Sequence, residues 1–178
     1  GCPGRCTYCC TKLIFGYRFR FRSIKNVADE IELLLSKGVK EIHIMDDNFT
    51  VYKEWVLKFR DEILKRNIKT TFVFANGLRA DKIDEEILRA LKQIGVLSVG
   101  FGVESGNQNI LNIIKKGIEL DTVRKAYKLS KKLDKIYNFV LNDSPKIGLP
   151  GGRSSLLIHP PASDYGGAYV LVSLDDDF

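Results

Sequence analysis

Patterns typical of β-strands alternate with patterns typical of amphipathic helices along most of this chain. Three apolar runs are typical of strands, at residues 39–45, 70–74 and 96–103. Apolar residues recur at helical spacing at residues 24–35, 55–63, 83–94 and 108–133, the last interrupted near Gly117. The strand patterns end at Met45, Phe74 and Gly102, which lie 29 and 28 residues apart. This period predicts right-handed βα units, and therefore an α/β fold built on parallel strands.

The pattern changes after residue 133. Residues 136–141 are consistent with one more strand, and the remainder to residue 178 is rich in glycine and proline and ends in an acidic run. We therefore expect a core at residues 1–133, and then one more strand, the fifth when a missing first strand is counted, followed by an irregular tail at residues 134–178. The first cysteine, Cys2, comes too early for a strand to precede it, so we expect a fragment of a longer protein.

Composition and charge limit the classes of protein that this chain can belong to. Hydrophobic residues make up 44% of the 178 residues and charged residues 28%, as in an ordinary globular domain. No apolar run reaches the roughly 18 residues that a membrane span needs. The net charge of +6 is typical of a lysine-rich surface, and we expect no nucleic-acid partner.

All four cysteines lie within the first ten residues, and three of them form the pattern C-x-x-x-C-x-x-C at Cys2, Cys6 and Cys9. A disulfide framework would spread them along the chain, so we expect a metal site in a reducing compartment, the cytoplasm. Three thiolates can hold three irons of a [4Fe–4S] cluster and leave the fourth iron open. Structural zinc is the alternative, although it usually takes four ligands. Cys10 is expected to be a small packing residue.

Polar residues follow each of the three strand patterns, where the carboxyl ends of parallel strands place ligand sites. These clusters are Asp46, Asp47 and Asn48; Asn76, Arg79 and Asp81; and Glu104, Ser105 and Gly106. Asp46 and Asp47 could bind an ammonium or hydroxyl group, or cap the next helix. Glu104 could accept from a ribose hydroxyl or pair with Arg79, and the absence of a side chain at Gly102 lets a ligand approach closely.

Two further features have a structural interpretation. Aromatic residues alternate with arginines at residues 15–21, which predicts an extended segment that covers the carboxyl edge of the sheet, with aromatics inward and arginines outward. Nucleic-acid binding is the alternative. His43 lies in the middle of a strand pattern, where we expect a packed histidine.

Several of these stretches resemble the radical S-adenosylmethionine enzymes. The matching stretches are residues 1–10, 21–23, 45–50, 78–81 and 101–106. The chain is more narrowly similar to the branch that often carries a cobalamin-binding domain, which includes enzymes like the anaerobic magnesium-protoporphyrin cyclase. The resemblance covers residues 1–133, whereas residues 153–178 match nothing in this family and Gly152 replaces an acidic residue of a Gly-Leu-Pro-Gly-Glu-like turn.

The resemblance implies a partial (β/α) TIM-like barrel of parallel strands, with its first strand missing from this chain and an irregular C-terminal part. It also implies that Cys2, Cys6 and Cys9 bind the cluster and that Tyr8 lies by the adenine of the cosubstrate. The remaining cosubstrate-binding residues would be Asp46, Asp47, Arg79, Gly102, Glu104 and Ser105.

The activity implied by the resemblance is reductive cleavage of S-adenosylmethionine by the [4Fe–4S] cluster. The resulting 5′-deoxyadenosyl radical would act on an unknown small-molecule substrate, in methyl transfer or cyclisation. An external donor such as flavodoxin or ferredoxin would supply the electron, and cobalamin would take part only through a domain outside this chain. The alternatives from other classes are a zinc-binding interaction module and a simple iron–sulfur electron-transfer protein.

Overall fold

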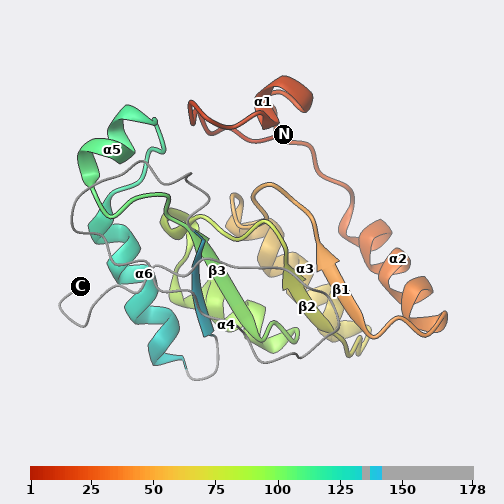
Figure 1. The fold of residues 1–178 in the computed structure, drawn as a ribbon. Helices are drawn as coiled ribbons and strands as arrows, with labels where there is room; N and C mark the ends of the chain where they lie inside the picture. The colour runs from red at the N-terminus through yellow and green to blue at the C-terminus, as the bar shows by residue number, and fades with distance from the viewer. Residues whose placement is uncertain (134–136, 142–178) are drawn as a thin grey trace.

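Strands and helices alternate in the computed structural model, which describes residues 1–133 and 137–141 (Figure 1). The elements in chain order are α1 (Thr11–Ile14), α2 (Ile24–Ser36), β1 (Glu41–Ile44), α3 (Lys53–Lys65), β2 (Thr71–Phe74), the 3₁₀ helix η1 (Ala80–Lys82), α4 (Glu85–Gln93), β3 (Ser98–Gly102), α5 (Gln108–Ile113), α6 (Leu120–Lys132) and β4 (Tyr137–Leu141). The predicted α/β alternation is confirmed, including the helix break at Gly117 and a strand after residue 136. The single-turn helix α1 was not foreseen.

The strands pair in parallel. β1 pairs with β2 and β3 pairs with β4, while isolated bridges at Phe72–Val96 and Leu78–Phe101 link the two pairs. A closed barrel is not formed by the described residues, so the barrel expectation is supported only as far as parallel α/β structure. Whether residues 142–178 form an irregular tail lies outside the described residues.

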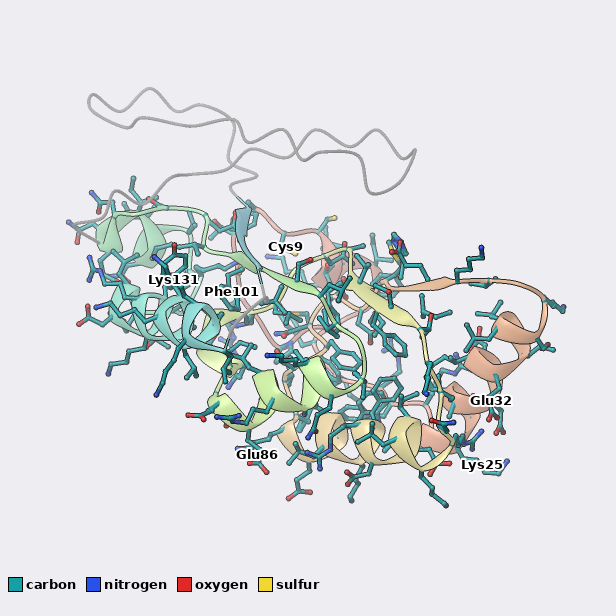
Figure 2. All side chains as sticks on the ribbon, turned by 90° about the horizontal axis from the view of Figure 1, so that it is seen from below. Cys9, Lys25, Glu32, Glu86, Phe101 and Lys131 are labelled. Atoms are coloured by element: carbon teal, nitrogen blue, oxygen red, sulfur yellow. The ribbon has the colours of Figure 1, made fainter. Side chains whose placement is uncertain are left out.

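Helices α2, α3, α4 and α6 cover one face of the strands, as right-handed crossovers require (Figure 2). Side chains that point to this layer form the core, including Phe72 and Phe74 of β2 and Val99 and Phe101 of β3. Charged side chains such as Lys25, Glu86 and Lys131 lie on the solvent side of the helices (Figure 2).

The opposite face of the strands differs from the sequence expectation. The apolar run at residues 39–45 contains β1, but along this strand exposed Glu41 and His43 alternate with half-buried Ile42 and Ile44. The prediction of a packed His43 was therefore wrong: its ring nitrogen Nε2 lies 2.6 Å from Glu41 Oε1 at the surface. On β3 the residues on this second face include Gly100 and Gly102, which alternate with buried Val99 and Phe101.

The aromatic segment at residues 15–21 packs at only one end. Phe19 and Phe21 contact Tyr52 and Trp55 at the start of α3, with ring centroids 5.0 to 6.1 Å apart. Phe15, Tyr17 and Phe21 are nevertheless each about half exposed, at 49%, 52% and 48%. The expectation that every aromatic residue of this segment points inward is therefore wrong.

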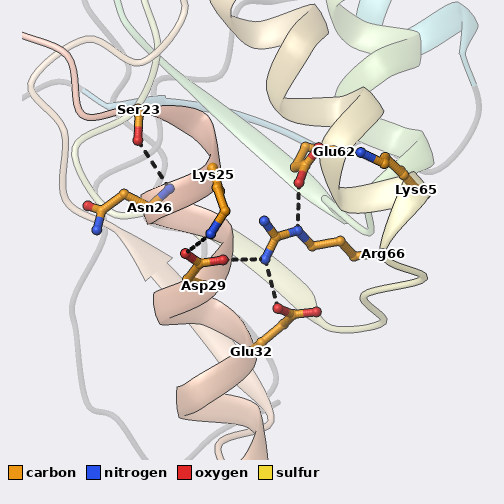
Figure 3. A network of polar contacts seen from close by, with 8 residues as sticks. All are labelled: Ser23, Lys25, Asn26, Asp29, Glu32, Glu62, Lys65 and Arg66. Atoms are coloured by element: carbon orange, nitrogen blue, oxygen red, sulfur yellow. Dashed lines mark hydrogen bonds and ion pairs between the residues drawn. The ribbon is translucent and has the colours of Figure 1, made fainter.

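A polar network joins α2 to α3 (Figure 3). The Arg66 guanidinium, at the end of α3, bonds Asp29 and Glu32 of α2 and Glu62 of its own helix, each at 2.7 Å. Lys25 adds a second cation on Asp29 at 2.9 Å. The Arg66 side chain is only 15% exposed, so its guanidinium is largely enclosed between α2 and α3.

Candidate functional site

The three cysteines lie on the loop before α1, beside the carboxyl ends of the strands (Figure 1). Cys2, Cys6 and Cys9 are free, partly buried thiols, whereas Cys10 is exposed, which contradicts its expected packing role. Backbone bonds fix the loop: Thr7 N–H donates to the Ile114 carbonyl at 2.9 Å. Gly4 packs closely on the thiols, since a Cβ there would lie 3.3 Å from Cys2 Sγ and 3.9 Å from Cys6 Sγ.

The number and type of these thiols suit an iron–sulfur cluster. Within the described ranges, no three His, Cys, Asp or Glu side chains converge closely enough to hold one metal ion. An iron–sulfur cluster takes each thiolate on a different iron, so its ligands need not converge on one point. Three free thiols on one loop can ligate three irons of a [4Fe–4S] cluster and leave the fourth iron open.

A lysine links the cysteine loop to the end of β3. Lys116 Nζ donates to Glu104 Oε1 at 2.7 Å and to the Tyr8 hydroxyl at 3.2 Å. Both charged side chains of the pair are only 10% exposed. Burial of the hydroxyl, then the nearby Glu104 carboxylate and the Cys6 thiol, hold the pKa of Tyr8 well above its ordinary value. The Tyr8 phenol therefore stays protonated and able to donate a hydrogen bond.

Glu104 and Gly102 lie together at the end of β3. A Cβ at Gly102 would be 3.4 Å from both Glu104 Oε1 and Lys116 Nζ, so a small residue leaves room for the ion pair. Glu104 has φ of +74°, a conformation that costs a non-glycine residue about 1–3 kcal/mol. Ser105 accepts from the Asn107 N–H at 3.1 Å and so shapes the turn that follows.

Arg79 has a different partner from the one considered from sequence. Its guanidinium pairs with Asp81 at 2.8 Å, while Glu104 pairs with Lys116. Arg79 also donates to the carbonyls of Lys116 at 3.1 Å and Gly117 at 3.0 Å. Arg79 thereby ties the segment after β2 to the α5–α6 turn, which carries Lys116.

Asp46 and Asp47 follow β1, but neither caps α3, whose N-cap is Tyr52. The capping alternative is therefore wrong. Asp47 Oδ1 accepts from Thr11 Oγ1 of the α1 turn at 3.4 Å. The pKa of the Asp46 carboxyl is raised, first by burial of that carboxyl and then by repulsion from the Asp47 carboxylate. A cationic or hydroxyl partner would therefore stabilise the ionised form of Asp46.

Sequence reasoning did not assign a role to two residues of this region. Lys116 was missed because it is one of many lysines, and only the neighbouring break at Gly117 hinted at a turn there. Asn48 was noted after the β1 pattern but given no role. It is 1% exposed, and both its amide nitrogen and its amide oxygen lack a hydrogen-bond partner within the described part of the chain.

The fold and the cysteine loop together define an α/β protein with a loop of free thiols at the carboxyl edge of parallel strands. The chain belongs to the Radical SAM superfamily, whose family model matches residues 1–141.

Curated relatives are similar over most of this chain. An uncharacterized methyltransferase of Pyrococcus horikoshii is 33% identical over 133 residues, which are 74% of this chain and 28% of the relative. The anaerobic magnesium-protoporphyrin IX monomethyl ester cyclase of Synechocystis is 35% identical over 74% of this chain and 26% of its own length. The chain thus spans between a quarter and a third of the length of these relatives.

Solved structures share the fold. The radical S-adenosylmethionine methyltransferase TsrM from Kitasatospora setae, solved with cobalamin and a [4Fe–4S] cluster, superposes with a TM-score of 0.71 at 20% identity. The match covers 80% of this chain and 29% of TsrM. OxsB, a cobalamin-dependent S-adenosylmethionine radical enzyme, superposes with a TM-score of 0.62 at 21% identity, over 77% of this chain and 22% of OxsB.

Within residues 1–133 and 137–141, no helix has the length and apolar character needed to cross a bilayer.

Proposed function

We propose that this chain is the cluster- and cosubstrate-binding part of a radical S-adenosylmethionine enzyme, with residues 1–133 as its core. The observation that carries the proposal is the loop of three partly buried free thiols, held over the buried Lys116–Glu104 pair. Cys2, Cys6 and Cys9 would hold a [4Fe–4S] cluster. When bound, this cluster supplies the electron for reductive cleavage of S-adenosylmethionine.

The surrounding residues prepare the cosubstrate site. Lys116 pairs with the Glu104 carboxylate and orients it, and Glu104 would accept from a ribose hydroxyl next to the space at Gly102. The protonated Tyr8 would lie by the adenine. Asp46 and Asp47 would accept from the methionine ammonium, and this cation would relieve the repulsion between the two carboxylates. Arg79 and Ser105 act through the turns that they hold.

The reaction that would follow cosubstrate cleavage is inferred from the relatives. Relatives include methyltransferases and a cyclase, which supports methyl transfer or ring closure on a small-molecule substrate. TsrM and OxsB bind cobalamin, which supports a cobalamin domain outside this chain. Family membership favours this function over a zinc module or a simple electron-transfer protein. The free thiols fit a reducing compartment, and we expect the cytoplasm.

The test is low-temperature electron paramagnetic resonance of the anaerobically reconstituted, dithionite-reduced chain, with and without S-adenosylmethionine. We expect a [4Fe–4S]¹⁺ signal that changes when S-adenosylmethionine is added, together with 5′-deoxyadenosine detected by mass spectrometry. Cys6→Ala should lose both readouts, whereas Cys10→Ala, the matched control, should keep them. A cluster signal indifferent to S-adenosylmethionine would instead support electron transfer, and bound zinc without iron would support an interaction module.

A further inference from the structure

A recess of about 550 Å³ lies against the first half of the cysteine loop, the segment after β2 and the α5–α6 turn. It is continuous with the site described above, because Arg79 and Lys116 line it and Lys116 Nζ reaches Tyr8 and Glu104. Its volume lies within the roughly 300–1,000 Å³ that is typical of small-molecule sites. The recess therefore extends the proposed cosubstrate site and offers room for a second small molecule beside it.

The wall of the recess includes Asn48, from the segment after β1. Asn48 is 1% exposed, and neither its amide nitrogen nor its amide oxygen has a hydrogen-bond partner among the residues that the structure describes. Buried polar groups without partners destabilise a fold and are rare unless a ligand or an ordered water completes them. A molecule in the recess could supply both an acceptor for the amide N–H groups and a donor for the amide oxygen.

The charge of the recess selects for an anion. Five of its lining residues are lysine or arginine and one, Asp81, is acidic. Asp81 is already paired with Arg79 at 2.8 Å. Arg5 and Lys115 are exposed, and neither forms an ion pair with any residue in the described ranges. This excess of positive charge disfavours a metal cation and favours an oxyanion, whose oxygens accept hydrogen bonds from cationic and amide groups alike.

We propose that the recess binds the oxyanion head group of the small-molecule substrate, a phosphate, phosphonate or carboxylate, an inference that rests on the proposed function. The oxyanion would accept from the Asn48 amide nitrogen and from Arg5 and Lys115, while a hydroxyl of the same molecule would donate to the Asn48 amide oxygen. A head group held there would position the rest of the substrate beside the cosubstrate residues that Lys116 contacts.

The carboxylate of S-adenosylmethionine is a second source of the same chemistry, so the test separates the two. Inorganic phosphate is the probe, and its affinity for the anaerobic, cluster-loaded chain is measured by titration calorimetry at low salt, with and without saturating S-adenosylmethionine. We expect the two to bind together, with less than about a twofold change in phosphate affinity. Displacement of phosphate by S-adenosylmethionine would overturn the assignment of the recess to the substrate.

The variant that tests the recess is Asn48→Leu, which keeps the branching of the side chain and removes both amide groups. The matched control is Thr50→Val, because Thr50 Oγ1 is also buried without a partner in the described part of the chain, but Thr50 does not line the recess. We expect Asn48→Leu to weaken phosphate binding by about tenfold or more, and Thr50→Val to change it by less than about twofold. Lys115→Gln should weaken it by about threefold, whereas Lys125→Gln, at an exposed position of α6, should not.

Thermal unfolding of the phosphate-free variants separates binding from structure. Since Asn48→Leu removes buried groups that have no partner, its melting temperature should stay the same or rise, whereas loss of a structural amide would lower it. A lowered melting temperature together with lost phosphate binding would therefore overturn the proposal. Equal phosphate binding by the wild type and Asn48→Leu would mean an adventitious ion only and would overturn it too, as would the absence of binding by the wild type. If the proposed function itself is wrong, phosphate will still bind as expected, but dithionite will not drive S-adenosylmethionine cleavage in the wild type.

Discussion

Lys116 connects two parts of the candidate site that are distant in sequence. Its ammonium lies between Glu104, at the end of β3, and Tyr8, in the cysteine loop. Because both charged side chains are 10% exposed, neither charge can turn to water if the other is removed. This cation therefore adds a buried side-chain link to the backbone bond from Thr7 to Ile114 that also holds the cysteine loop over the strand ends.

We expect Lys116→Met to lower the free energy of unfolding by about 3 kcal/mol, since the Glu104 carboxylate is left buried and unpaired. Urea unfolding of the metal-free chain measures this loss. Adding Glu104→Gln should restore at least about 1 kcal/mol, because no unpaired charge remains. Lys115→Met, at the exposed neighbouring position, should change stability by less than about 0.5 kcal/mol. Equal losses in the two single variants would contradict a role for the buried pair.

At the scale of elements, the distance from a turn to the neighbouring backbone determines whether that turn can accommodate a side chain. Gly95 joins α4 to β3 with φ of +98°, and a Cβ there would lie 2.3 Å from the Thr70 carbonyl oxygen. Gly38 joins α2 to β1 with φ of +89°, and a Cβ there would meet nothing within 4 Å. The two glycines thus share a left-handed type of backbone but differ in the space around them.

We expect Gly95→Ala to cost about 3 kcal/mol of unfolding free energy, because the backbone strain is joined by a clash that moves β3 away from β2. Gly38→Ala should cost only the conformational strain, about 1–2 kcal/mol. Chemical denaturation of both variants measures the difference. Similar costs at the two positions would show that strand spacing is not the limiting feature.

The Arg66 network makes the packing of α2 on α3 sensitive to acid (Figure 3). Arg66 holds the pKa of Glu62 below its ordinary value of 4.5, and Lys25 followed by Arg66 holds the pKa of Asp29 below 3.8. A depressed carboxyl pKa contributes stability above the unfolded pKa, and this contribution is lost as the pH falls through the folded pKa.

We therefore expect wild-type stability to fall steeply below about pH 4.5, and Arg66→Gln to reduce this fall because the carboxyl pKa values return toward their unfolded values. Urea unfolding between pH 3 and pH 7 measures the slope. Lys65→Gln is the control, because Lys65 reaches Glu62 only at 3.7 Å and is 78% exposed. An unchanged slope in Arg66→Gln would mean that other carboxyls determine the acid response.

For the whole molecule, ligand binding should be linked to global stability. S-adenosylmethionine at 100 times its dissociation constant stabilises a folded state by about 2.7 kcal/mol. We expect the melting temperature of the cluster-loaded chain to rise by about 5–10 °C, measured by anaerobic calorimetry. The cluster-free chain should show little change, because the open iron is absent. An equal rise without the cluster would mean that the cosubstrate binds independently of it.

Much of the fold could be predicted from sequence because its signals are local. The helical spacing of apolar residues predicted α2, α3, α4 and α6, and the break at Gly117 separated α5 from α6. Ends of strands were less well predicted: the run at residues 39–45 contracts to β1, Glu41–Ile44. Strand pairing ends at the residue where the backbone turns away from the partner strand, and the apolar pattern of the sequence does not mark that residue.

For the candidate site, the sequence predicted the kinds of side chain better than it predicted their arrangement in space. The spacing of Cys2, Cys6 and Cys9 is a property of ten consecutive residues, so the loop of free thiols could be predicted from the chain itself, while the cluster that it would hold stays a prediction. Which face of each strand is covered, why His43 is exposed, and that Glu104 pairs with Lys116 while Arg79 pairs with Asp81 were decided only by the tertiary structure. Partners for buried charges come from whichever segments the fold brings within about 3 Å, and sequence periodicity carries no information about contacts of that range.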